Sequence, residues 1–365
     1  MLERFKPRKE DQVRIPEESL RETVTAIFEK MGETPEAAAE GADVLVMTDL
    51  RGVETHGVSN MMRVYVEQYS KGDLKPGSEW RVVRESPGTV TIDAGGGLGI
   101  MLGRRAMGLA MEKARKVGMG VVTMHMSGHL GAVGHFAMLA AEQDMVGVCI
   151  TAGGDGVLPT FGAEPRLGAN PISLAAPARN EVPVLFDAAT SAIAGNKVSL
   201  AQRVGAELLP GWIADTEGNP ILEETPVPER GQYSQLPLGG TREQGSHKGY
   251  GFSLMVEVLG SMLSGSVPTM LDNIPGESMF KNYFAAYNIA AFADLETFKD
   301  NMDGMLENLR TARPAPGHER VLYPGLYEHE EVQERRANGI PFHGEVVEWF
   351  DGISEELSVP RLRRM

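Results

Sequence analysis

Apolar positions near the N-terminus recur with the period of a helix. A helix is predicted over residues 16–31, because one face carries Leu20, Val24, Ile27 and Phe28. Thr34 followed by Pro35 is typical of an N-cap with proline at the first helical position, which predicts a second helix over residues 35–49. A third helix is expected to end at Gly72, since an apolar stripe precedes it at Val58, Met61, Met62, Tyr65 and Tyr69. The charged residues 1–15 are expected to form a flexible arm.

Further along, the pattern alternates between short apolar runs and longer amphipathic segments. Strands are predicted at WRVV, TVTID, MGVVTMHM, MVGVCITA, PISLAAPA, VPVLFDAA and NYFAAYNIAAF. Helices are predicted over residues 99–117, 131–143, 248–263 and 295–312, the first of them ending at Gly118. Because strand–helix–strand succession is the unit of a parallel or mixed sheet, the pattern predicts an α/β protein. The polar tail from residue 329 onward is expected to end in a short helix.

Composition and charge narrow the class of partner. The 365 residues are 42% hydrophobic and 23% charged, with a net charge of −15. This balance disfavours nucleic acid, whose phosphates need clustered lysine and arginine, but it permits a locally basic site for a small anion. No apolar run reaches the ~20 residues of a membrane span, and the N-terminus lacks the apolar segment of a signal peptide. The lone Cys149 excludes an intramolecular disulfide and fits a reducing cytoplasm, so we expect a cytoplasmic protein without membrane contact.

The glycine-rich stretches do not follow the common nucleotide-binding patterns. No G-x-G-x-x-G follows a predicted strand, and no G-x-x-x-x-G-K-[ST] is present. The run GGGLG at residues 95–99 has the wrong spacing. If the protein binds a dinucleotide, it does so outside the doubly wound Rossmann pattern.

The eight histidines include two candidate positions for chemistry. His56 lies at the joint between two predicted helices, where a helix-capping or core role is the alternative to catalysis. His125, His129 and His135 cluster around a strand end and the next helix. A zinc site is not expected there, because the chain has no HEXXH motif and no cysteine near the cluster.

Three other stretches favour binding of an anion. SGHLGAVGHF places His129 in a glycine-rich turn whose amide groups can face an anion. DAATSAIAGNK follows a predicted strand, and GSHKGYGF places Lys248 at a helix start, against the helix dipole. A phosphate partner would explain that position, and an exposed lysine without a partner is the alternative.

Taken together, these stretches resemble the malate/L-lactate dehydrogenase family, which lacks a Rossmann fold and also includes ureidoglycolate and sulfolactate dehydrogenases, diketogulonate reductase and Δ1-piperideine-2-carboxylate reductase. The resemblance runs from about Ile15 to Pro341. Its landmarks occur in order as ETHGVSNMMRVYV, GDLKPG, SGHLGAVGHFAMLAAEQDMVGV, FGAEPRLGANPI, LFDAATSAIAGNK, LLPGWIADTEGNP, LPLGGTREQGSHKGYGFSLMVEVLGSMLSG, and YPG followed by ANGIP.

The resemblance implies roles for particular residues. His56 corresponds to the catalytic proton donor, and Thr55 replaces the usual serine while keeping its hydroxyl. His129 is implied in catalysis or in the nicotinamide pocket, and Lys197 stands where the imine-reducing branch has an aspartate. The implied cofactor contacts are Gly153, Asp187, Ala189, Thr190, Ser191 and Lys248.

Two positions on the substrate side depart from the family pattern. Many relatives have a carboxylate-clamping arginine four residues after the histidine, where this chain has Asn60. Ala169 stands in place of a threonine in the L-G-T-N-P stretch. The carboxylate is therefore expected to be held otherwise, for instance by Arg63 or Arg166, or the substrate is not a simple 2-oxo acid.

The fold implied by the resemblance is a mixed, largely antiparallel sheet with a helical lobe built from both chain ends. It divides into a helical N-terminal lobe with the catalytic histidine (1–80), an α/β cofactor-binding domain (81–295) and a C-terminal helical segment that packs on the N-terminal lobe (296–365). A homodimer is implied as well.

The implied reaction is hydride transfer between a nicotinamide cofactor and a small 2-hydroxy or 2-oxo acid. NAD is preferred, and NADP stays open because Arg203, Arg179 and Lys113 are equal candidates for a 2′-phosphate. Reduction of cyclic or N-alkyl imines, which Lys197 disfavours, and a nucleotide-binding protein without catalysis are the alternatives.

Overall fold

The computed structural model describes residues 3–6, 8–271 and 279–365. Its central sheet has seven strands in the order β2-β3-β4-β10-β5-β6-β7. The strands are β2 Arg81–Glu85, β3 Thr89–Asp93, β4 Met119–Ser127, β5 Met145–Ala152, β6 Ile172–Ala176, β7 Val184–Ala188 and β10 Phe280–Asn288. Only β3 and β4 run parallel, and every other neighbouring pair is antiparallel. The predicted mixed, largely antiparallel sheet is confirmed.

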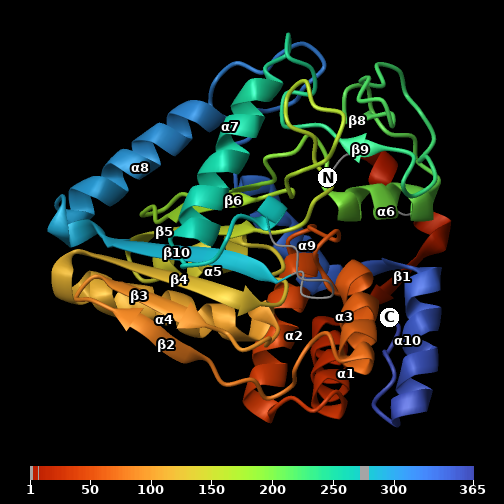
Figure 1. Cartoon of the computed structure of the whole chain (residues 1–365), viewed down its shortest axis with the longest axis horizontal. Coiled ribbons are helices and arrows are strands. Elements are labelled where there is room, and N and C mark those ends of the chain that lie inside the picture. Colours follow the sequence, from red (N-terminus) through yellow and green to blue (C-terminus); the bar gives the residue numbers. More distant parts are fainter. Residues whose placement is uncertain (1–2, 7, 272–278) are drawn as a thin grey trace.

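Helices cover both faces of this sheet (Figure 1). Helices α4 Gly99–Val117 and α5 Gly134–Ala141 pack on one face. They approach closely because Gly120 and Gly147 face them: a Cβ there would lie 2.0 Å and 2.1 Å from the carbonyl oxygens of Ala110 and Ala137. Helix α7 Ser246–Val256 lies on the other face and continues as a π-helical turn, Glu257–Met262.

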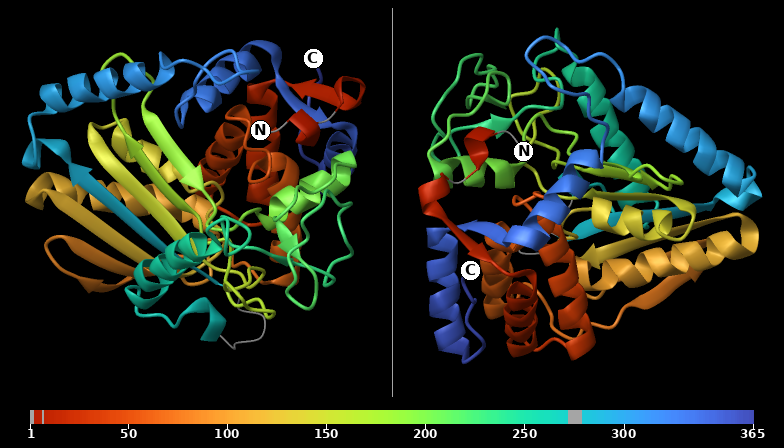
Figure 2. Two further views of the ribbon diagram at one scale, coloured as in Figure 1. Left: turned by 90° about the horizontal axis from the view of Figure 1, so that it is seen from above. Right: turned by 180° about the vertical axis from the view of Figure 1, so that it is seen from behind.

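The helical lobe beside the sheet is built from both ends of the chain (Figure 2). Helices α1 Glu17–Lys30, α2 Pro35–Leu50 and α3 Val58–Lys71 come from the N-terminal part, and α9 Leu326–Asn338 and α10 Gly344–Leu357 from the C-terminal part. Strand β1 Gln12–Ile15 pairs with β11 Ile340–His343 and joins the two parts. The prediction of a flexible arm over residues 1–15 is wrong for these residues, because β11 supplies a pairing partner. Residues 1, 2 and 7 of that prediction lie outside the described residues.

The start of the arm is docked as well. Phe5 is fully buried and stacks on Trp212, with ring centroids 5.7 Å apart. It completes a small apolar cluster under helix α6 Gly195–Val204, near the short strands β8 Ile213–Ala214 and β9 Ser234–Gln235. Brief 3-10 turns occur at Glu3–Phe5, Lys9–Asp11, Thr269–Leu271 and Ile289–Ala291.

Helix α8 Leu295–Arg310 stays with the sheet and not with the helical lobe. Its Lys299 pairs with Asp144 in the turn before β5, and its Glu296 pairs with Arg179 after β6. The division of the chain at residues 80 and 295 stays a prediction. Among the described residues, no helix is both long and apolar enough to cross a bilayer.

Candidate active site

A cavity of about 500 Å³ lies where the helical lobe meets one end of the sheet. The segments that line it include the turn between α2 and α3, the loop between β4 and α5, the end of β5, residues 169–171, the stretch from β7 into α6, and residues 324–328. Its polar lining includes Arg51, Thr55, His56, His129, His135, Asp187, Ser191, Lys197 and Glu328. The segments come from distant parts of the chain and meet only in the fold.

His56 is held at the α2–α3 turn by two contacts. Its backbone N–H donates to the carbonyl oxygen of Val53 at 3.0 Å, and its Nδ1 lies 2.9 Å from Oγ1 of Thr55. This leaves Nε2 as the ring nitrogen without a partner among the described residues. Burial, together with the charge of Lys197, lowers the pKa of His56 to about 4, so the imidazole is neutral near pH 7 and able to accept a proton.

His129 stacks beside His56, with ring centroids 5.7 Å apart. Its Nδ1 lies 2.7 Å from the hydroxyl of the fully buried Tyr65. Burial, and to a lesser degree His56, lowers the pKa of His129 to about 3, so this ring is neutral too. A buried hydroxyl needs an acceptor, and among the described residues Nδ1 of His129 is the polar atom bonded to the Tyr65 hydroxyl. We infer that Tyr65 donates to Nδ1, which places the proton of His129 on Nε2.

Replacing Tyr65 with phenylalanine is expected to lower kcat/KM by about tenfold, because an unsatisfied Nδ1 leaves the tautomer of His129 unfixed. The measurement is steady-state turnover in the reaction that the family resemblance implies. Tyr69→Phe is the matched control, since Tyr69 lies one turn further along α3 and donates to Glu33. Equal rates for wild type and Tyr65→Phe would contradict the assigned tautomer.

Lys197 lies in the first turn of α6 and faces the cavity near His56. Its side chain is partly removed from water, and this burial lowers its pKa. Asn60 ties the neighbouring helices together, because its Nδ2 donates to the carbonyl oxygen of Asn196 at 3.0 Å. Its Oδ1 is buried and has no partner among the described residues, and the residue does not line the cavity.

The glycine-rich turn before α5 faces the side-chain carboxyl group of Asp187. The N–H of Gly134 donates to Oδ2 of Asp187 at 2.7 Å. Asp187 is the last residue but one of β7, and burial raises its pKa to about 6. Arg51 faces the same region, and its pKa is lowered by burial. Sequence reasoning missed Arg51, although it is the only arginine that lines the cavity among the described residues.

The far wall of the cavity depends on a close approach of two loops. A Cβ at Gly168 would lie 1.6 Å from the carbonyl oxygen of Gly153, so position 168 admits only glycine in this backbone. Asn170 joins the loops, since its Oδ1 accepts from Gly153 N at 3.2 Å and its Nδ2 donates to the buried Glu257 at 3.1 Å. Glu257 begins the π-helical turn, where the predicted helix 248–263 departs from α-helical form.

Comparison with known proteins agrees with this arrangement. A family model described as malate/L-lactate dehydrogenase matches residues 15–350. The chain belongs to the malate/L-lactate dehydrogenase family. A malate dehydrogenase of Pyrococcus abyssi is 37% identical over 97% of each chain. An L-sulfolactate dehydrogenase of Methanocaldococcus jannaschii is 33% identical over 87% of this chain and 90% of the relative.

The solved structure of malate dehydrogenase from Pyrococcus horikoshii superimposes with a TM-score of 0.88 at 35% identity, covering 97% of this chain and 98% of the other. The predicted family and its non-Rossmann fold are confirmed. As a member of the malate/L-lactate dehydrogenase family, the protein is an oxidoreductase that acts on the CH–OH group of hydroxy acids.

The structure brings most of the family-implied residues to one place. Thr55, His56, His129, Gly153, Ala169, Asp187, Ala189, Ser191 and Lys197 line the cavity. Thr190 lies just behind, with its N–H and hydroxyl both bonded to the carbonyl oxygen of Ala169. Within the described residues, no cluster of three or more histidine, cysteine or acidic side chains is arranged to hold a metal ion.

Three basic residues that the sequence predicts to bind substrate or cofactor do not line the cavity. Arg63 is exposed and lies over the ring of Trp349, 5.9 Å from its centroid. Arg166 is exposed and pairs with Glu164, and Lys248 is exposed in the first turn of α7. The apolar stripe of α3 faces the core, so Arg63, which lies off that stripe, points away from the site.

Proposed function

We propose that the protein transfers a hydride between nicotinamide C4 and C2 of a small 2-hydroxy or 2-oxo acid, with His56 as proton acceptor and donor. The observation that carries the proposal is the neutral imidazole of His56, oriented by Thr55 and open to a cavity that also holds Lys197 and the donor nitrogen of His129.

In the oxidative direction, the side chains handle the proton and the charge. Neutral His56 takes the proton of the substrate hydroxyl while C2 gives up hydride. The nicotinamide supplies the hydride acceptor or, in reverse, the donor. Lys197 and the Nε2–H of His129 stabilise negative charge that develops on the oxygen. In the reverse direction, protonated His56 returns the proton to that oxygen, which closes the balance.

Two cations in the cavity suit the two anionic parts of the ligands. Lys197 lies near His56 and fits the substrate carboxylate or reacting oxygen, in place of the arginine absent at Asn60. Arg51 lies toward Asp187 and Glu328 and fits the diphosphate of the cofactor. Held in this way, both reactants would meet beside His56.

We propose NAD as the preferred cofactor. Two of the three candidates for a 2′-phosphate already have carboxylate partners: Lys113 donates to Glu85 at 2.9 Å, and Arg179 bonds to Asp300. None of the three, Arg203 included, lines the cavity. A cytoplasmic location stays a prediction.

The deciding experiment is oxidation of NADH and of NADPH against oxaloacetate, pyruvate, and pyruvate with methylamine. Turnover of a 2-oxo acid without amine supports the proposal. Turnover that requires methylamine would favour imine reduction, the alternative that Lys197 in place of aspartate disfavours. Tight nucleotide binding without turnover of any substrate in a broad panel would favour a binding protein.

We also propose a homodimer. Large apolar side chains are exposed along α7 and the π-helical turn at Phe252, Leu254, Met255, Val258, Met262 and Leu263. An exposed apolar face of this kind is typical of an interface. Light scattering is expected to give twice the mass of one chain, and the mass of a single chain at micromolar concentration would contradict the dimer.

A further inference from the structure

The turn that carries His56 is capped by a residue of the preceding helix. Helix α3 begins after Gly57, which offers no side-chain cap. Asp49, in the last turn of α2, supplies one, because its Oδ2 accepts from the N–H of Val58 at 2.6 Å. Asp49 is fully buried, and a Cβ at position 57 would lie 2.2 Å from its Oδ1. The carboxylate thus fills the space beside Gly57 and satisfies a helix N-terminus.

The same turn is held from outside by Arg335 of helix α9. Its Nη1 donates to the carbonyl oxygen of Asp49 at 2.8 Å, and its Nη2 donates to Oε1 of Glu54 at 3.0 Å. Its Nε donates to Glu331 at 2.8 Å, one turn back on the same helix. Arg335 is 2% exposed and Glu54 4% exposed. One guanidinium therefore bonds to both ends of the segment from Asp49 to Glu54. Glu54 is two residues before His56.

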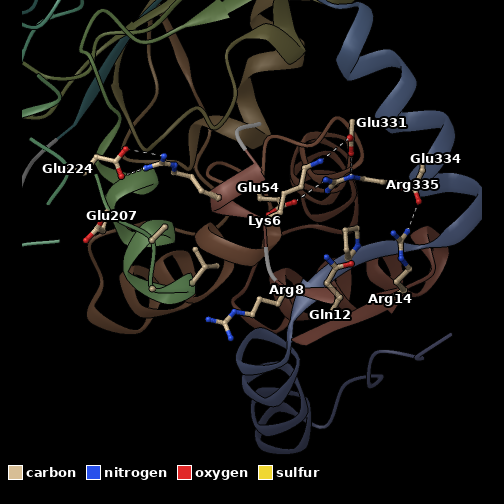
Figure 3. Close-up of a pocket in the computed structure, with 15 residues that line it drawn as sticks. Lys6, Arg8, Gln12, Arg14, Glu54, Glu207, Glu224, Glu331, Glu334 and Arg335 are labelled. Atoms are coloured by element: carbon tan, nitrogen blue, oxygen red, sulfur yellow. Dashed lines mark hydrogen bonds and ion pairs between the residues drawn. The ribbon is translucent and has the colours of Figure 1, made fainter. Parts of the chain in front are cut away.

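The turn between Asp49 and His56 borders two spaces, and Figure 3 shows the second of them. One space is the active-site cavity. The other is a charged cleft of about 1020 Å³, which Glu54, Glu331 and Arg335 line together with Lys6. Lys6 lies 4.0 Å from Glu331 at the cleft side. The charged side chains thus lie on the cleft side of the turn, and His56 lies on the cavity side.

Stability alone is a weak reason for such an arrangement. Burying an arginine with carboxylates costs desolvation that often cancels the attraction between them. The planar guanidinium does, however, fix geometry through several directed hydrogen bonds at once. A fixed geometry matters most where a proton must be delivered to a defined atom.

We propose that Arg335, with Asp49 and Glu54, is a positioning network that holds the imidazole of His56 in its reactive orientation. The inference rests on the proposed role of His56. None of the three residues lines the active-site cavity, so the network acts on kcat through His56 and leaves nucleotide binding unchanged.

The test compares Arg335→Met with Arg336→Met in kcat, in the Kd of NADH and in thermal melting. Arg336 is the matched control, because it follows on the same helix, is exposed and bonds to Glu17 at the surface. Arg335→Met is expected to lower kcat by about 10- to 100-fold, as a small misplacement of a catalytic group does. The Kd of NADH is expected to stay within about twofold, since only an interaction made in the transition state is lost.

Arg335→Lys keeps the charge but cannot reach three acceptors, so an intermediate kcat is expected. It also serves as the test if Arg335→Met fails to fold. Glu54→Gln keeps one side-chain oxygen that can accept from Nη2 of Arg335, so this single variant is expected to retain most of the wild-type kcat.

The decisive readout is the double variant with His56→Ala. If Arg335 acts through His56, neither substitution at position 335 will lower the residual rate of His56→Ala any further. An equal fall in both backgrounds, or a loss of thermal stability with kcat unchanged, would overturn the positioning role. A normal kcat for His56→Ala alone would instead refute the proposed function, so the two failures are distinguishable.

Discussion

His56→Ala is expected to lower kcat by about 10²–10⁴-fold, the usual contribution of a general acid–base group. The substitution removes the imidazole that Thr55 orients and whose Nε2 has no partner among the described residues. Cofactor affinity is expected to change little, because the proposal places the diphosphate at Arg51 and not at His56. Steady-state kinetics in both directions, with fluorescence titration of NADH, would measure the two effects separately.

Chemical rescue sharpens this test. Imidazole added to His56→Ala is expected to restore part of the rate, because the vacated space opens to the cavity. His329→Ala is the control for a histidine substitution as such, since His329 is on α9 and bonds to Gln333 at the surface. A near-normal kcat in His56→Ala would remove this residue from the reaction.

Lys197→Met is expected to lower kcat/KM for a hydroxy acid by about 10²–10³-fold, the range found when a group that stabilises developing negative charge is removed. It should also change the pH dependence. In the proposed mechanism, hydroxy-acid oxidation needs neutral His56, so its rate falls as pH drops through the pKa of that residue, which burial and Lys197 lower to about 4. Since the charge of Lys197 helps to lower this pKa, its removal should shift the acid limb to higher pH.

The pH profile of kcat/KM checks this shift. Lys116→Met provides the control, because Lys116 is exposed on α4 and pairs with Glu112. A rate that falls without any movement of the acid limb would separate Lys197 from His56 and assign the lysine to binding alone.

Local periodicity was enough to predict much of the fold. Helix α4 spans Gly99–Val117 and ends at a left-handed Gly118, as the spacing and the glycine predict. The N-terminal arm could not be predicted in this way, because the strand that pairs with Gln12–Ile15 is Ile340–His343. Pairing over such a separation leaves no local signal in a four-residue segment.

The same limit applies to the site. Residues in compact motifs, such as Thr55 and His56, could be predicted from neighbouring positions. Tyr65 could not, because it belongs to the apolar stripe of α3 and its hydroxyl partner lies in another loop. Arg335 is separated from Asp49 by 286 positions. Arg63 lies close to Thr55 and His56 in the sequence but does not line the cavity, so its predicted substrate contact stays a prediction.

The pairing of β1 with β11 also determines when the helical lobe can finish folding during synthesis. Residue 12 leaves the ribosome long before residue 343, and at ordinary synthesis rates the delay is on the order of tens of seconds. During that time the segment α1–α3 is already synthesised but lacks α10. Phe350 of α10 is fully buried in the complete helical lobe. A chain that stopped before Ile340 would therefore keep all seven strands of the central sheet but would lack the partner of β1 and the helix that covers α1.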